Sequence, residues 1–223
     1  MTEFHGFGEK AIPFLKALDF HQDRDWFKEN RDLYESELNG PRGALIQDLT
    51  VRFAEAGLPY RGDPKKSVFR IYRDIRFSKD KRPFNRHVSI ILTPDGTKRS
   101  DGCFYLHVGL EGCFMAVAFY SPAPDALKRM RNSIIAWPER YRTMIKALAS
   151  QGLELDSGDA LKRLPRGFET VEEEDLAAGV KKRHFLVRED IDPARITSPE
   201  LADDCVDFAK RAHPLFEWGI GAI

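Results

Sequence analysis

The residues best suited to chemistry lie in one short stretch of the chain, "FRIYRDIRFSKDKRPF" at positions 69–84. Six cations here accompany only two acids, whereas Lys+Arg and Asp+Glu both number 35 in the whole chain. Arginine presents a rigid fork of donors that matches phosphate or carboxylate. The expected anion-binding residues are Arg70, Arg73, Arg76 and Lys81. Asp74 would orient the arginines or act as a general base.

The same cations also fit a purely structural interpretation. Residues 151–204 carry fourteen acids and eight bases, so this acidic segment could neutralise the basic stretch. A solvated charge run is the commonest meaning of such a pattern. However, exposed ion pairs contribute only about 0–1 kcal/mol each, so stability alone is a weak reason to crowd cations together. The sequence leaves the anion site and the internal network open as alternatives.

Two alternating segments downstream, "CFYLHVGL" and "CFMAVAFY", predict a β-hairpin turning at Leu110-Glu111. The register that this turn implies gives one wholly apolar face. Its expected pairs are Phe104 with Val117, Leu106 with Met115, and Val108 with Cys113.

The other face of this hairpin is mixed, because Tyr105 and His107 stand beside alanines. Such small neighbours leave room for a helix or a ligand. We expect Tyr105 to line a cleft there, and His107 is a candidate base. A packed, hydrogen-bonded histidine is the alternative for His107.

Helices and strands segregate along the chain. Helical spacing fills the first 56 residues, with Asn39-Gly40 as a break, and returns at 123–152 and after 199. Residues 153–182 are polar and irregular. The strands expected besides the hairpin are "SVFRIYRD", "RHVSIILT" and "HFLVRED". This order predicts one α+β domain over residues 1–223, with a mainly antiparallel sheet of about five strands flanked by N-terminal and C-terminal helices.

Several functional classes lose support. The chain has no phosphate-binding glycine loop, no G-x-S-x-G elbow and no paired C-x-x-C, and its six histidines lack ligand spacing. We expect no metal and no cofactor, and no motif decides whether the protein is an enzyme. Three sparse cysteines, no signal-peptide pattern and no apolar run of about 20 residues predict a cytoplasmic protein that does not span a membrane.

One longer motif resembles a known signature, R-x-x-R-D-x-R-F-x-x-D-K, which begins at Arg70 and ends at Lys81. The segments "DRDWF", "FYLHVGLEG", "SPAPDALKRMR" and "LKRLPRGFE" extend the likeness over nearly the whole chain. It resembles a family of uncharacterised, mostly bacterial proteins, a domain of unknown function. The resemblance implies a single domain in which the signature residues form a site or a core network, and it adds weight to His107. It implies no particular function.

Three functional hypotheses remain. The first is an arginine-rich cleft that binds a phosphate- or carboxylate-bearing small molecule, with hydrolysis or transfer as the chemistry if there is any. The second is a nucleic-acid-binding module, since Arg and Lys interleave with aromatic residues. Because the whole chain has no net charge, we rank the nucleic-acid hypothesis below the first. The third is a protein-interaction module that docks an acidic partner. The sequence leaves the oligomeric state open.

Overall fold

The structure, a computed structural model, describes residues 3–223 and has the expected α+β composition. Over that range, four antiparallel strands form one sheet in the order β1-β2-β3-β4. The strands are β1 (His87–Leu92), β2 (Cys103–Gly109), β3 (Gly112–Phe119) and β4 (Phe185–Ile191). The helices that precede the sheet are α1 (Ala11–His21), α2 (Arg24–Glu29), α3 (Arg31–Tyr34), the π-helix η1 (Glu35–Asn39) and α4 (Gly40–Glu55). Those that follow β3 are α5 (Pro124–Ala136), α6 (Pro138–Ser150), α7 (Glu174–Lys181), the 3₁₀ helix η2 (Pro193–Thr197), α8 (Leu201–Arg211) and α9 (His213–Ile220).

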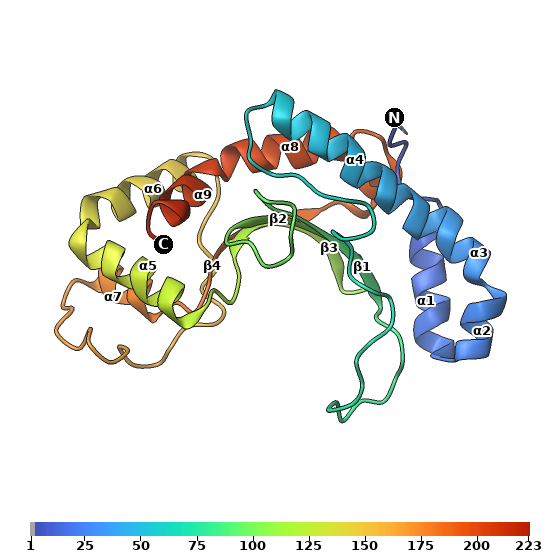
Figure 1. The fold of residues 1–223 in the computed structure, drawn as a ribbon, viewed down its shortest axis with the longest axis horizontal. Coiled ribbons are helices and arrows are strands. Elements are labelled where there is room, and N and C mark those ends of the chain that lie inside the picture. The colour runs from blue at the N-terminus through green and yellow to red at the C-terminus, as the bar shows by residue number, and fades with distance from the viewer. Residues whose placement is uncertain (1–2) are drawn as a thin grey trace.

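The helices cover only one face of the sheet. Figure 1 shows an arch in which α4 and α8 run along that face, with α1–α3 beyond one edge and α5–α7 beyond the other. The opposite face, here called the free face, lies on the inside of the arch. None of the helices in the described part of the chain is long and apolar enough to cross a bilayer.

The predicted hairpin and its register are confirmed. β2 pairs with β3 so that Phe104 lies opposite Val117, Leu106 opposite Met115, and Val108 opposite Cys113. All six side chains are buried and belong to the main hydrophobic core. Strict alternation places one residue of every two on the covered face, so the intervening residues line the free face.

The prediction of about five strands is not confirmed, because "SVFRIYRD" forms isolated bridges instead of a strand. Its first part pairs with β1, where the Ile91 amide donates to the Ser67 carbonyl at 2.9 Å. Further along it leaves β1, and the Arg73 amide donates to the Pro83 carbonyl at 2.8 Å. Pro83 has no amide hydrogen to return that bond, so the ladder ends. The segment between Tyr72 and Phe84 then projects from the sheet as a loop (Figure 1).

The expected break at Asn39-Gly40 is also wrong, because the chain stays helical from α3 through η1 into α4. Gly40 has helical backbone angles, φ −61° and ψ −56°. Pro41 lacks an amide hydrogen and would clash with the carbonyl four residues earlier in a regular helix. The wider π-helical turn that precedes it relieves this conflict without ending the helix.

Candidate functional site

A row of stacked side chains crosses the free face of the sheet. The ring centroids of His87 and His107 lie 4.3 Å apart, and His107 stacks on Phe114 at 4.7 Å. On the far side of Phe114, the Arg188 guanidinium lies 3.9 Å from the ring centroid. Gly109 makes room for the row, because a Cβ there would lie 2.7 Å from His107 Nε2 and from the His87 Cβ. One side chain from each strand therefore joins a single polar and aromatic row.

The environment of this row holds His107 in its neutral form. Burial, followed by the charges of His87 and Arg188, lowers the pKa of His107 to about 4. Burial also lowers the pKa of His87. The Tyr105 hydroxyl lies 3.4 Å from His107 Nδ1, at the long end of hydrogen-bond range. At neutral pH His107 is thus an uncharged imidazole with a phenol beside it.

Three adjoining hollows follow the free face, and we name each by its lining. The arginine pocket, about 410 Å³, is lined by residues that include Phe69, Arg70, Arg73, Asp74, Ser89 and Tyr105. The aromatic pocket, about 490 Å³, includes Phe69, Tyr105, Phe114, Ala116, Ala118 and Tyr120. The histidine pocket, about 290 Å³, includes Arg73, Asn85, His87, His107, Leu110 and Glu111. Shared lining residues join them, so the three hollows form one groove.

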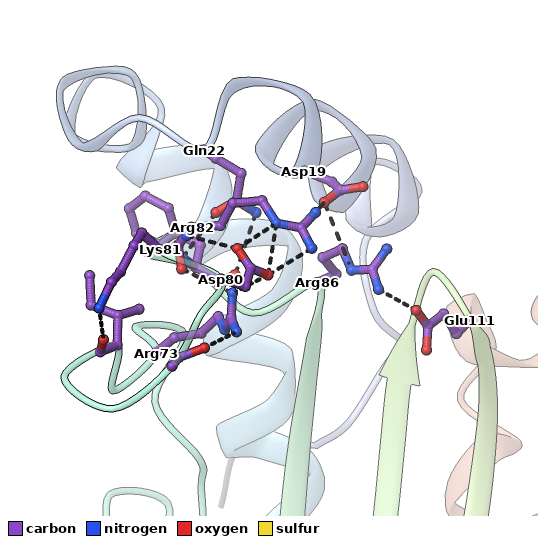
Figure 2. A network of polar contacts seen from close by, with 11 residues as sticks. Asp19, Gln22, Arg73, Asp80, Lys81, Arg82, Arg86 and Glu111 are labelled. Carbon is purple, nitrogen blue, oxygen red and sulfur yellow. Dashed lines mark hydrogen bonds and ion pairs between the residues drawn. The ribbon is translucent and has the colours of Figure 1, made fainter.

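Three of the six cations of the basic stretch, Arg73, Arg76 and Arg82, are paired with nearby acids. Arg73 donates to Asp80 at 2.8 Å, and the Asp80 carboxylate also receives Arg82 (Figure 2). Arg86 pairs with Glu111 and lies 3.8 Å from Asp19. Within the described chain, no ion pair of residues 61–86 reaches the acidic segment 151–204. An internal ion-pair network therefore exists. Within residues 3–223, its cations pair with nearby carboxylates and with Asp19 of α1, and not with the acidic segment 151–204.

The loop also neutralises Arg76. Its guanidinium binds both oxygens of Asp74, at 3.0 and 2.7 Å. Arg76, both through its side chain and through its amide, lowers the pKa of Asp74 to about 2. Asp74 is therefore a weak proton acceptor and is better suited to orienting Arg76. Lys81 donates to the Ile75 carbonyl at 3.0 Å and does not line the three named pockets (Figure 2).

Arg70 differs from its neighbours. Its exposed guanidinium has no hydrogen-bond or ion-pair partner among residues 3–223, and it lines the arginine pocket. The Arg70 backbone is held in place, since the Asn85 side-chain amide donates to the Arg70 carbonyl at 3.0 Å. The predicted residues Arg70, Arg73, Asp74 and Tyr105 therefore share one pocket, and His107 lines the next one beside Arg73.

Lys98 is a second cation that sequence reasoning missed, and it contacts the pocket residue Phe69 without lining any of the three pockets itself. Its ammonium lies 4.7 Å from the centroid of the Phe69 ring and donates to the Val68 carbonyl. Burial lowers the pKa of Lys98, and the positive charges of Arg42 and Arg70 lower it further. Lys98 comes from the loop between β1 and β2, so no spacing in the sequence connects it with Arg70.

The comparisons with known proteins bear on this geometry. The family described as conserved hypothetical protein DUF2461 matches residues 10–218. The chain belongs to this family. The match includes all three pockets and every cation discussed above. No curated protein and no solved structure matches the chain significantly.

This DUF2461 protein has one further polar group that sequence reasoning missed. Ser89 is 3% exposed and lines the arginine pocket, yet its hydroxyl makes no hydrogen bond of normal geometry with residues 3–223. It lies near enough to Tyr105 to offset part of the rise that burial causes in the pKa of that phenol. A serine inside the apolar run "HVSIIL" was the available signal, because a buried hydroxyl without a partner is costly.

No group of three or more metal-ligating side chains occurs in the described part of the chain. Within the groove, the structure brings together cations, hydroxyls, neutral imidazoles and aromatic rings, together with four carboxylates, Asp74, Asp80, Glu111 and Asp156. Of these groups, the cations and the rings suit recognition of an anion joined to an apolar body.

Proposed function

We propose that the protein binds a small molecule carrying a phosphate or carboxylate group in the arginine pocket. The observation that carries this proposal is Arg70, whose unpaired guanidinium lines that pocket. Its neighbours Arg73 and Arg76 already hold carboxylates. Arg70 therefore has its full set of donors available for an incoming anion.

A second cation strengthens the proposal. Lys98 and Arg70 act on each other as like charges, and no acidic partner of Lys98 is present among residues 3–223. Asp74 feels the charge of Arg70 but is already bound by Arg76, so it offsets the repulsion between Arg70 and Lys98 only in part, and stability is a weak reason for their placement. A bound anion would remove the repulsion between them and would itself be held by charge-assisted hydrogen bonds.

The backbone around these cations is fixed before any ligand arrives. Arg42, buried in α4 at 3% exposure, donates to the Phe69 carbonyl at 3.1 Å. Asn85 holds the next carbonyl, that of Arg70. Such pre-organisation supports binding, because less conformational entropy is lost when the ligand is bound.

The catalytic roles predicted for His107 and Asp74 stay predictions. A neutral His107 beside Arg73 in the histidine pocket supports proton transfer at that end of the groove. The low pKa of Asp74 favours its orienting role instead.

The test is binding of inorganic phosphate, measured by the rise in melting temperature and by calorimetry. We expect phosphate to stabilise the native protein, as any ligand specific for the folded state does. Arg70→Gln and Lys98→Gln should lose most of this effect. Arg129→Gln removes an exposed arginine of α5 and should keep it. Equal responses of Arg70→Gln and Arg129→Gln would refute the proposal.

One observation favours nucleic acid as a second candidate. Phe77 is 95% exposed at the projecting loop, the Arg76 guanidinium lies 5.8 Å from its ring centroid, and Tyr72 is 46% exposed. Exposed rings between cations can stack bases of a single strand. Anisotropy of a labelled oligonucleotide should then show affinity that falls steeply between 50 and 200 mM salt and depends on Phe77. Affinity indifferent to salt and to Phe77→Ala would exclude it.

A further inference from the structure

We infer that the ligand is a planar, mainly apolar molecule with one anionic substituent, whose ring system lies in the aromatic pocket while its anionic group meets Arg70 and Lys98. This inference rests on the proposed function and specifies the part of the ligand that the arginine pocket does not bind. The anionic substituent is either a phosphate or a carboxylate, since both groups match the donors of a guanidinium.

The floor of the aromatic pocket is flat and apolar. It consists of Cys103, Ala116 and Ala118, which are 7%, 5% and 4% exposed and lie on neighbouring strands. Their short side chains leave the sheet surface low at its centre. Burial raises the pKa of Cys103 to about 12, so the thiol stays protonated and the floor carries no charge.

Aromatic rings form the walls of this pocket. The Tyr105 ring centroid lies 6.2 Å from that of Phe69 and 5.9 Å from that of Phe114. Tyr120, 69% exposed, lies at the β3 end. The pocket volume of about 490 Å³ is within the usual range for sites of small organic molecules. A flat ring system that lies on the alanines would contact these walls by stacking or edge contacts.

The charged side chains that line the aromatic pocket have partners of their own, so the ring system of the ligand need not be charged. Arg188 is held by Asp190 at 2.6 Å and lies over Phe114. Asp156 lies 3.8 Å from His184. Arg188 therefore has a carboxylate partner, and Asp156 lies beside a histidine. At the opposite end, neither Arg70 nor Lys98 forms an ion pair among residues 3–223, and Asp74, the carboxylate that Arg70 acts on, is bound by Arg76.

The aromatic and arginine pockets meet at Phe69 and Tyr105, which line both. Lys98 lies over Phe69, and Arg70 is the next residue along the chain. Ser89, whose hydroxyl lacks a normal partner, lines the arginine pocket beside Tyr105. A ligand that spans the junction would place its anionic group near both cations.

The experiment compares four probes by calorimetry: 2-naphthyl phosphate, 2-naphthoate, 2-naphthol and inorganic phosphate. Burying the naphthyl ring should make 2-naphthyl phosphate roughly 10- to 100-fold tighter than inorganic phosphate. 2-Naphthol should bind more weakly than either naphthyl acid. The ratio of the dissociation constants of 2-naphthyl phosphate and 2-naphthoate identifies which anionic group the site prefers. Octyl phosphate, flexible and without a ring, should bind several-fold more weakly than 2-naphthyl phosphate, and equal affinity would overturn the planar requirement.

Ala118→Leu fills the aromatic pocket. It should abolish the gain in affinity that the naphthyl ring provides and leave the affinity for inorganic phosphate unchanged. Ala149→Leu adds the same volume to an exposed position of α6 and should change neither affinity. Thermal unfolding checks that Ala118→Leu folds, and Ala116→Val is the substitute if it does not. Arg70→Gln should weaken phosphate and naphthyl phosphate by the same factor, about tenfold or more.

The two possible failures are distinguishable. If inorganic phosphate binds through Arg70 but the naphthyl ring adds nothing, the inferred ligand class is wrong and the proposed function stands. If 2-naphthol and 2-naphthyl phosphate bind equally and only Ala118→Leu weakens them, the anion site is wrong. If none of the probes binds, both are overturned.

Discussion

Protonation of His107 should destabilise the folded protein. The pKa of its imidazole falls from 6.5 to about 4 on folding, because the ring is buried and lies beside His87 and Arg188. Between these two pH values the unfolded chain binds a proton that the folded chain does not. Stability therefore decreases as the pH falls from about 6.5 to about 4. The two values differ by about 2.5 pH units, and each unit corresponds to about 1.4 kcal/mol, so about 3 kcal/mol is an upper bound on the loss; solvent screening of the partly exposed ring reduces it to about 1–2 kcal/mol.

The assay is guanidinium unfolding at pH 7, 5.5 and 4.5 for the native protein, His107→Gln and His5→Gln. Carboxylates titrate in the same window, so the informative quantity is the difference between variants. His107→Gln should lose less stability on acidification than the native protein, whereas His5→Gln, at an exposed position, should behave like the native protein. His87→Gln should raise the pKa of His107, measured by NMR. Equal acid sensitivity of His107→Gln and the native protein, together with a His107 pKa near 6.5, would refute this account.

Three further substitutions test a close approach in the groove, a helix cap and the hydrophobic core. Gly109→Ala should destabilise the fold by about 1–3 kcal/mol in denaturant unfolding, since its Cβ would lie 2.7 Å from His107 Nε2. Gly43→Ala in α4 is the matched control and should be neutral or stabilising, because the nearest atom lies 3.7 Å away. Asp23→Ala removes the cap that accepts from the Trp26 amide at 2.8 Å and should cost about 0.5–2 kcal/mol by the same measurement. Phe104→Ala empties a fully buried core position and should cost about 3–5 kcal/mol, and a loss below 1 kcal/mol would contradict its place in the core.

The parts of the fold that were predictable depend on neighbours in the sequence. The β2–β3 register followed from alternation and a two-residue turn, because both strands and their connection lie within one short segment. Asp23 as a helix cap is equally local. In these segments, side-chain period and turn chemistry favour the structure that forms.

The parts that failed depend on contacts with distant segments. α7 lies within a region expected to be irregular, and its Gly179 weakens any helix prediction. In the structure a Cβ at Gly179 would lie 2.9 Å from the Tyr141 hydroxyl, so the glycine allows α7 to approach α6. Gly179 is therefore explained by the packing of α7 against α6, which cannot be predicted from the neighbouring sequence.

The candidate site was likewise only partly predictable from the sequence. The sequence identified the basic stretch, and the structure shows that Arg73, Arg76, Arg82 and Arg86 are already paired. Asp74 and Asp80, both within the stretch, hold Arg73, Arg76 and Arg82, and Asp19 of α1 adds a further contact to Arg82. Position within the stretch gave no reason to single out Arg70.

The composition of the free face bears on why helices cover only the other side of the sheet. An antiparallel sheet with one face open to water usually has polar residues there. Here the open side instead carries Tyr105, Phe114, Ala116 and Ala118, which belong neither to a hydrated surface nor to a packed helix interface. Charged side chains flank them, Arg188 at one edge and Arg70 at the other, and both would discourage another apolar protein surface from docking across the groove. A face too apolar for water and too charged at its margins for a second sheet or helix supports our proposal of a small amphipathic ligand.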